Sequence, residues 1–160
     1  MRGIFGWGPL VSEEFEGDFA RVSGGLDAAR QQLLGAVERL GEADLDRGTR
    51  GGWTVRKVLE HTIQSEWFYA AGVDALRERT PRRPAPGDID LGSLSAVLAS
   101  LEKSRQALQD AAEGVDEDAF YAVRTVLHQE YSVLSILENV ELHDNEHSAQ
   151  IGRILSNSAE

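Results

Sequence analysis

Apolar residues recur at steps of three and four along most of this chain, a spacing that gathers them on one face of an α-helix. The repeat breaks at segments that are glycine-rich, proline-rich or mixed, so it predicts long amphipathic helices instead of a sheet. Helices that each bury one apolar face pack together as a bundle. We therefore expect an all-α, four-helix-bundle protein with a single domain over residues 1–160 and, after an irregular leader, helices at approximately 18–40, 54–78, 93–113 and 132–156.

Two long connections separate these predicted helices. Residues 80–92 hold three of the four prolines and show no periodicity, so they predict a loop. Its basic pair, Arg82 and Arg83, is most simply solvated. Residues 115–131 have a mixed pattern, part of which could be a short extended piece, and we expect this segment to be a connector.

The middle of the second predicted helix is apolar all round, with Trp67, Phe68 and Tyr69 adjacent in sequence. A helix of this kind is covered on more than one side. It is either buried inside the bundle or part of a subunit contact, where aromatic residues are enriched. On this ground we expect a homodimer, and a buried bundle helix is the alternative.

Composition excludes several functional classes. The chain carries 27 acidic and 16 basic residues, and its net charge of −11 would repel phosphate backbones and anionic lipids, so we expect no nucleic-acid or membrane partner. No apolar run approaches the roughly 20 residues that span a bilayer, and the first residues form no continuous apolar signal region. We therefore expect a cytoplasmic protein. The chain has no cysteine, so any thiol chemistry would use a thiol brought by a substrate.

Histidines at helical spacing are the residues best suited to chemistry. His143 and His147 are four residues apart and continue the apolar stripe of the fourth predicted helix, so both rings should point inward from one face. His61 in the second predicted helix is compatible with an inward aspect. A bundle can bring three imidazoles around one divalent ion, which they would bind at about 2.0–2.1 Å. Three such ligands leave a position open for water or substrate, as in catalytic zinc sites.

Three polar residues lie about one turn from these histidines and could orient the ligands or a substrate: Ser65, Asn139 and Gln150. Three neutral imidazoles leave the double charge of the ion in place, so a coordinated thiol or water would be strongly acidified. Imidazole suits several first-row ions. Zn²⁺ and Ni²⁺ are our first choices, with Fe²⁺ and Mn²⁺ as alternatives.

Simpler interpretations stand beside the metal site. A pair of histidines four residues apart arises by chance, and buried histidines are often merely hydrogen-bonded. A zincin protease is excluded, because Asp144 stands where the H-E-x-x-H motif has glutamate. His128, a further candidate for the pocket, is most simply a solvated loop histidine. Glu66 and Glu130 are acid–base candidates only if they point inward.

Three segments resemble motifs of a known family. GGWTVRKVLEHT, residues 51–62, is similar to a tryptophan-led second-helix motif that ends in histidine, and HDNEHSAQI, residues 143–151, is similar to an H-x-x-x-H-x-x-Q-I motif. HQEYS, residues 128–132, resembles the segment that leads into the last helix. In order and spacing these motifs resemble the DinB-like superfamily of metal-dependent four-helix-bundle proteins, and the resemblance covers nearly the whole chain.

The resemblance implies a bundle, often dimeric, that binds one divalent ion through three histidines matching His61, His143 and His147. In characterised relatives the ion activates a low-molecular-weight thiol, mycothiol or bacillithiol, for transfer to an electrophile or for isomerisation of a thiol adduct. The chain departs from common members at four positions beside the ligands: Asn145, Glu146, Ser148 and Ala149. The family often has an arginine or histidine and then a glycine at the last two. These departures keep the ligands and leave the substrate class open.

Three functions follow as hypotheses. The first is a metal-dependent transferase in which a cosubstrate thiol binds the open position as a thiolate and attacks an electrophilic small molecule. The second keeps the site and replaces the thiol with water, which gives a metal-dependent hydrolase. The third is a non-catalytic, stress-related bundle that holds metal without turnover or whose site is degenerate.

Overall fold

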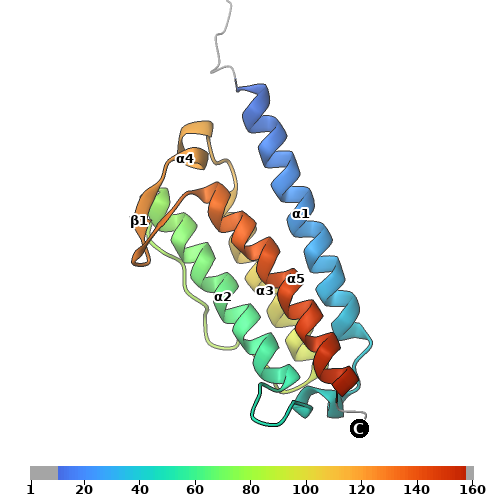
Figure 1. Ribbon diagram of the computed structural model, residues 1–160. Helices are drawn as coiled ribbons and strands as arrows, with labels where there is room; N and C mark the ends of the chain where they lie inside the picture. Colours follow the sequence, from blue (N-terminus) through green and yellow to red (C-terminus); the bar gives the residue numbers. More distant parts are fainter. Residues whose placement is uncertain (1–10, 158–160) are drawn as a thin grey trace, which may run out of the picture.

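The computed structural model describes residues 11–157 and consists mainly of four long helices that run side by side (Figure 1). These helices are α1 (Glu13–Glu38), α2 (Val55–Leu76), α3 (Leu94–Ala112) and α5 (Val133–Asn157). The connections contain the short helices η1 (Glu42–Asp46) and α4 (Glu117–Tyr121) and the strands β1 (Arg124–Val126) and β2 (Gln129–Tyr131). The prediction of an all-α four-helix bundle is confirmed.

Helix α1 begins before its predicted start at residue 18. Ser12 caps the helix, because its Oγ accepts a hydrogen bond from the Phe15 backbone N–H at 3.1 Å. The Glu117 carboxylate in turn accepts from both the N–H and the hydroxyl of Ser12, and the Phe15 ring packs edge-on against Phe120 at 5.2 Å between centroids. Contacts with α4 therefore make helical a segment that sequence alone assigned to the irregular leader. Residues 1–10 of that leader lie outside the described residues.

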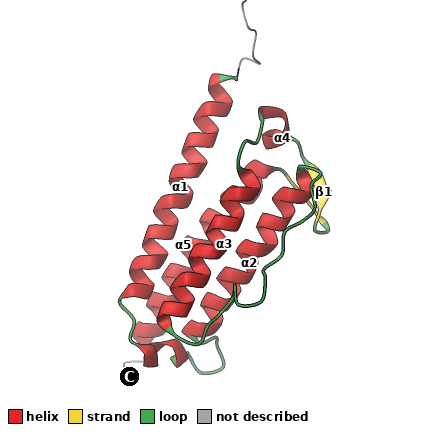
Figure 2. Ribbon diagram, turned by 180° about the vertical axis from the view of Figure 1, so that it is seen from behind, coloured by secondary structure: helices red, strands yellow, loops and turns green. Residues whose placement is uncertain are grey.

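Helix α5 occupies the position that brings the two histidine-bearing segments together. It packs along α1 on one side and along α2 on the other, and α2 also packs along α3 (Figures 1 and 2). The order around the bundle is thus α1, α5, α2 and α3, with α1 and α3 meeting only briefly. No helix in the described part of the chain is both long enough and apolar enough to cross a membrane.

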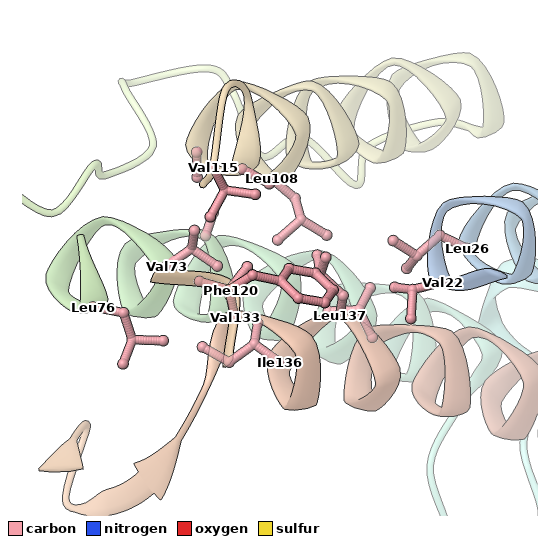
Figure 3. Close-up of a cluster of buried hydrophobic side chains, with 14 of the residues drawn as sticks. Val22, Leu26, Val73, Leu76, Leu108, Val115, Phe120, Val133, Ile136 and Leu137 are labelled. Carbon is pink, nitrogen blue, oxygen red and sulfur yellow. The ribbon is translucent and has the colours of Figure 1, made fainter. Parts of the chain in front are cut away.

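The apolar core is divided into two clusters, one toward each end of the bundle. In the cluster near α4, Phe120 is fully buried beside Val73, Leu108 and Leu137 (Figure 3). The cluster at the other end is built from side chains of all four long helices, among them Leu33, Leu59, Leu101 and Ile151. The layer between the two clusters contains buried charged and polar side chains, and this layer borders the candidate site.

Residues 115–131 connect two long helices as predicted, and they form α4 and an antiparallel hairpin in which Val126 pairs with Gln129, so the extended piece that the pattern allowed is present as β1. The two turn residues, Leu127 and His128, have φ values of 56° and 65°. This backbone usually calls for glycine or asparagine, so the sequence carried no hairpin signal. Gly72 lets the hairpin approach α2, because a Cβ at this position would lie 2.8 Å from Leu127 Cδ1.

The loop between α2 and α3 is tied to the bundle by a buried carboxylate. Asp74 is 1% exposed and accepts from Arg82 Nε at 2.7 Å and from Arg79 Nη2 at 2.9 Å. The expectation that Arg82 is solvated is therefore wrong, whereas Arg83 is exposed as expected. The pairing satisfies a carboxylate that would otherwise be buried without a partner.

Candidate metal centre

Three imidazole rings from two helices converge on one point. The centroid of His61, on α2, lies 5.5 Å from that of His143 and 5.1 Å from that of His147, both on α5. The two α5 rings are themselves 5.1 Å apart. One nitrogen from each ring can be chosen so that all three lie within 4.8 Å of one another. The structure thus brings together the three histidines that the sequence singled out.

The helix starts determine where these rings stand along the bundle. Thr54 caps α2, because its side chain accepts from the Lys57 backbone N–H. Ser132 precedes α5, and its Oγ accepts from the backbone N–H of Ser135, whose own Oγ accepts from the Ser132 N–H. Both starts lie close to the predicted ones. From them the helical repeat turns His61 toward α5 and turns the α5 histidines toward α2.

Two nitrogens of the cluster are buried and have no hydrogen-bond partner. Within residues 11–157, the buried side-chain nitrogen and oxygen atoms without a partner are His143 Nδ1, His147 Nε2 and Trp67 Nε1. Leaving such an atom unpaired costs about 1–3 kcal/mol, so native proteins seldom do so without a reason. Two of the three belong to rings of the histidine cluster, which indicates that a ligand completes their bonding.

The His147 ring is held in one tautomer by Gln150. The carbonyl oxygen Oε1 of Gln150 lies 3.0 Å from His147 Nδ1. Because a carbonyl oxygen can only accept, Nδ1 carries a proton, and in the neutral form of this ring the lone pair is on Nε2. That lone pair is on the unpartnered nitrogen of His147, which is 8% exposed. Gln150 therefore has the orienting role predicted from sequence, because its bond to Nδ1 leaves Nε2 of His147 as the nitrogen that can bind a metal.

The surroundings of His61 and His143 favour the neutral form of these two rings. Burial lowers the pKa of His61, and the neighbouring His147 and His143 lower it further. Burial likewise lowers the pKa of His143, assisted by His147 and opposed by Glu146 and Asp144. A neutral imidazole is the form that coordinates metal, so near neutral pH these two rings are ready to act as ligands.

Aromatic side chains border the histidine cluster. The Trp53 ring lies 5.1 Å from His61 between centroids and is 41% exposed. On the other side, the Tyr69 ring lies 5.8 Å from His143 and is packed edge-on by Tyr131 of the hairpin at 6.2 Å. Burial and then Tyr131 raise the pKa of Tyr69, so its hydroxyl stays protonated. Sequence analysis had not assigned these three residues to the site.

The remaining candidate residues take other places. Ser65 and Asn139 are partly buried, and no hydrogen bond joins either of them to the three rings. His128 is exposed at the tip of the hairpin and is not part of the cluster. Glu130 is exposed on β2. Glu66 does point inward, but its carboxylate accepts hydrogen bonds from two arginines and a serine.

These two arginines belong to a buried ion-pair cluster that sequence analysis missed. It joins one or more side chains from each long helix: Arg30, Glu66, Ser104, Arg105 and Asp144. The sequence does contain a signal for this cluster, because each charged member stands within the apolar stripe of its helix. Two of these members are positively charged and two are negatively charged. The members are nearly inaccessible to solvent, and Asp144 is 1% exposed.

The donor set fits a first-row divalent ion. Nitrogens bound to one tetrahedral ion at about 2.0–2.1 Å lie about 3.4 Å apart, so rings whose donors are within 4.8 Å would move together by up to about 1.4 Å on binding an ion. Three neutral nitrogens without a carboxylate suit zinc or a similar metal better than magnesium or calcium, which prefer oxygen ligands. His61 and His143 are only partly buried, so the cluster is reachable from outside.

A family model described as the DinB superfamily matches residues 25–151, a span that contains all three histidines. No curated protein and no solved structure shows significant similarity to the chain. The match extends over most of the sequence and over parts of all four long helices. The chain therefore belongs to the DinB superfamily.

Proposed function

We propose that this protein is a cytoplasmic, metal-dependent enzyme that transfers a low-molecular-weight thiol to an electrophilic small molecule. The observation that carries the proposal is the pair of buried, unpartnered nitrogens on His143 and His147, close to a third ring, His61. One divalent ion would satisfy all three rings. Zn²⁺ and Ni²⁺ are the first choices, and Fe²⁺ or Mn²⁺ would also accept imidazole.

A divalent ion with three neutral ligands supplies positive charge that lowers the pKa of a coordinated thiol or water. The protein sets the tautomer and the protonation state of the histidine ligands. Gln150 fixes the tautomer of His147, and burial keeps His61 and His143 neutral. Because the chain has no cysteine, the thiol would come from a cosubstrate of the bacillithiol or mycothiol type.

The aromatic border favours an organic electrophile as the second substrate. Trp53 offers a partly exposed ring face beside His61. The Tyr69 ring lies on the opposite side, near His143, and its hydroxyl is protonated. Apolar surface with a few directed polar groups is the usual lining of small-molecule sites.

Hydrolysis at the same site is the second candidate. Metal-assisted hydrolysis commonly uses a nearby carboxylate as general base. The two buried carboxylates closest in sequence to the ligands, Glu66 and Asp144, are both engaged by arginines. This engagement favours thiol transfer over hydrolysis. The third candidate, a bundle that binds metal without turnover, shares the same ligands.

A thiol-consumption assay separates the three candidates. Purified protein is incubated with bacillithiol or mycothiol and a panel of electrophiles, with and without Zn²⁺ or Ni²⁺, and the loss of free thiol is followed. We expect metal-dependent consumption that His147→Ala abolishes. The matched control His128→Ala replaces an exposed histidine outside the cluster and should retain the activity. Thiol loss that is independent of metal, or equal in the two variants, would overturn the proposal, and release of hydrolysis products without thiol would support the second candidate.

A further inference from the structure

The buried ion-pair cluster lies level with the metal centre. Asp144 stands between His143 and His147 in sequence, and at about 100° per residue its side chain leaves α5 about 60° around the helix from that of His147. Glu66 stands on α2 beyond His61, about 140° around the helix. On both helices the histidines face the neighbouring helix and the carboxylates face the bundle centre.

Two arginines clamp both carboxylates. Arg30 on α1 donates to Asp144 from Nε at 2.8 Å and to Glu66 from Nη2 at 2.9 Å. Arg105 on α3 donates to Glu66 from Nε at 2.8 Å and to Asp144 from Nη2 at 2.8 Å. Each guanidinium thus bridges the two helices that carry the histidines. Ser104 Oγ adds a bond to Glu66 at 2.6 Å.

The same arginines are also tied to the backbones of neighbouring helices. Arg30 Nη1 donates to the Leu101 carbonyl of α3 at 2.9 Å, and Arg105 Nη1 donates to the Leu26 carbonyl of α1 at 3.1 Å. The charges balance, with two positive and two negative groups. A buried arrangement of this kind adds little stability compared with apolar side chains of the same volume, because desolvation offsets the attraction. What it supplies is directional bonding that apolar contacts lack.

The metal centre needs that directional bonding. Apart from the bond between His147 and Gln150, no hydrogen bond within residues 11–157 orients the three rings. Their positions therefore depend on the rotation of α2 and α5. A ring nitrogen lies roughly 7 Å from the helix axis, so a rotation of about 10° moves it by about 1 Å. Metal–ligand distances tolerate a change of only about 0.2 Å.

We propose that Arg30, Glu66, Arg105 and Asp144 are positioning residues, which hold α2 and α5 in the rotation that brings the three imidazoles onto one ion. The inference rests on the proposed metal centre and adds to it the part of the chain that aims the ligands. It assigns the buried charges a role in metal affinity instead of overall stability.

The double variant Glu66→Met with Arg105→Met tests this role. It replaces one carboxylate side chain and one guanidinium side chain with apolar side chains of broadly similar volume. Arg30 stays paired with Asp144, so the remaining cluster is still neutral. The matched control is Asp74→Met with Arg82→Met, which removes an ion pair between a buried carboxylate and a partly buried guanidinium that ties down a loop remote from the rings. Each protein is prepared metal-free for three measurements: thermal unfolding by circular dichroism, Zn²⁺ affinity by competition with a chromophoric chelator, and the visible spectrum of bound Co²⁺.

We expect the Glu66–Arg105 variant to fold cooperatively, with an unfolding temperature near that of the parent. Its Zn²⁺ affinity should fall by about tenfold or more, and its Co²⁺ spectrum should change. The control variant should keep the affinity and spectrum of the parent. A folded Glu66–Arg105 variant that binds like the parent would overturn the inference, as would an equal loss in the control.

Two further results are decisive. If the double variant does not fold, Glu66→Gln replaces it, because the amide keeps the shape and can still accept from Ser104. Weaker Zn²⁺ binding in this variant supports the inference, and unchanged binding overturns it. If the parent itself binds no Zn²⁺ or Co²⁺, the metal centre and with it the positioning role are refuted, an outcome distinct from loss in the variants alone.

Discussion

Replacing His147 with alanine separates the effect of this ring on the stability of the metal-free protein from the stability gained on metal binding. In the metal-free protein, His147 Nε2 is buried without a partner, a penalty of about 1–3 kcal/mol that the variant no longer carries. The variant also loses the packing of an imidazole that is 8% exposed. These two changes oppose each other, so without metal the variant should unfold at nearly the temperature of the parent.

With metal the two proteins should diverge. A free metal concentration of about 100 times the parent Kd adds about 2.7 kcal/mol to its unfolding free energy. In a chain of this size that corresponds to a rise in Tm of roughly 5–10 °C. A variant that binds about 100-fold more weakly is then at its own Kd and gains only about 0.4 kcal/mol.

Thermal unfolding by circular dichroism, with and without Zn²⁺, measures both effects. His128→Ala is the matched control, because it removes an exposed histidine that lies outside the cluster. The control should show the full metal-induced rise in Tm. The reasoning is refuted if His147→Ala rises as much as the parent, or if the metal-free variant is already unfolded.

Four other predictions concern titration, ligand orientation, packing and assembly. The pKa values of His61 and His143 are lowered in the folded protein, so protons bind more tightly to the unfolded chain. The unfolding free energy of the metal-free protein should therefore fall as the pH drops below about 6.5. Denaturant titrations at several pH values would measure this decrease, which should be smaller in His143→Gln. Gln150→Leu removes the bond that fixes the His147 tautomer, so Zn²⁺ affinity measured by competition should fall about tenfold, and unchanged affinity would contradict this role. Phe120→Ala empties a fully buried position and should cost about 3–5 kcal/mol in denaturant unfolding, whereas a loss under about 1 kcal/mol would mean that the site collapses. Phe68 is 48% exposed, and if the expected homodimer uses it, Phe68→Glu should give a monomer in sedimentation where the parent is a dimer; a monomeric parent would remove that prediction.

Sequence patterns predicted what depends on local spacing. The four long helices follow from apolar periodicity, and the pairing of His143 with His147 follows from a separation of four residues on one helix. The convergence of His61 with them is different, because it depends on how α2 packs against α5. The sequence indicated only that the His61 side chain can point inward. The packing of the helices is what brings its ring near the other two.

Long-range contacts account for what sequence analysis missed. The turn at Leu127 and His128 has positive φ values without glycine or asparagine, so no local signal distinguished the hairpin from a connector. The start of α1 depends on Glu117, more than 100 residues away in the chain. Arg82 was read as solvated because its partner, Asp74, lies in a helix and shows no sign of burial in sequence.

The buried ion-pair cluster could have been predicted from the charged residues within the apolar stripes of the four helices. Arg30, Glu66, Arg105 and Asp144 each fall at an apolar-face position of a different helix, and charges at such positions are costly unless they are paired. Two positive and two negative intrusions in four helices predict mutual pairing. The partners of each charge, however, follow only from the order of the helices around the bundle.

The most direct test of the metal centre is a crystal structure of protein loaded with Zn²⁺, with the ion located by anomalous scattering. We expect one ion per chain, with nitrogens of His61, His143 and His147 at about 2.0–2.1 Å and a fourth position open to solvent or substrate. An ion bound elsewhere, or no ion between the three rings under stoichiometric zinc, would contradict the account.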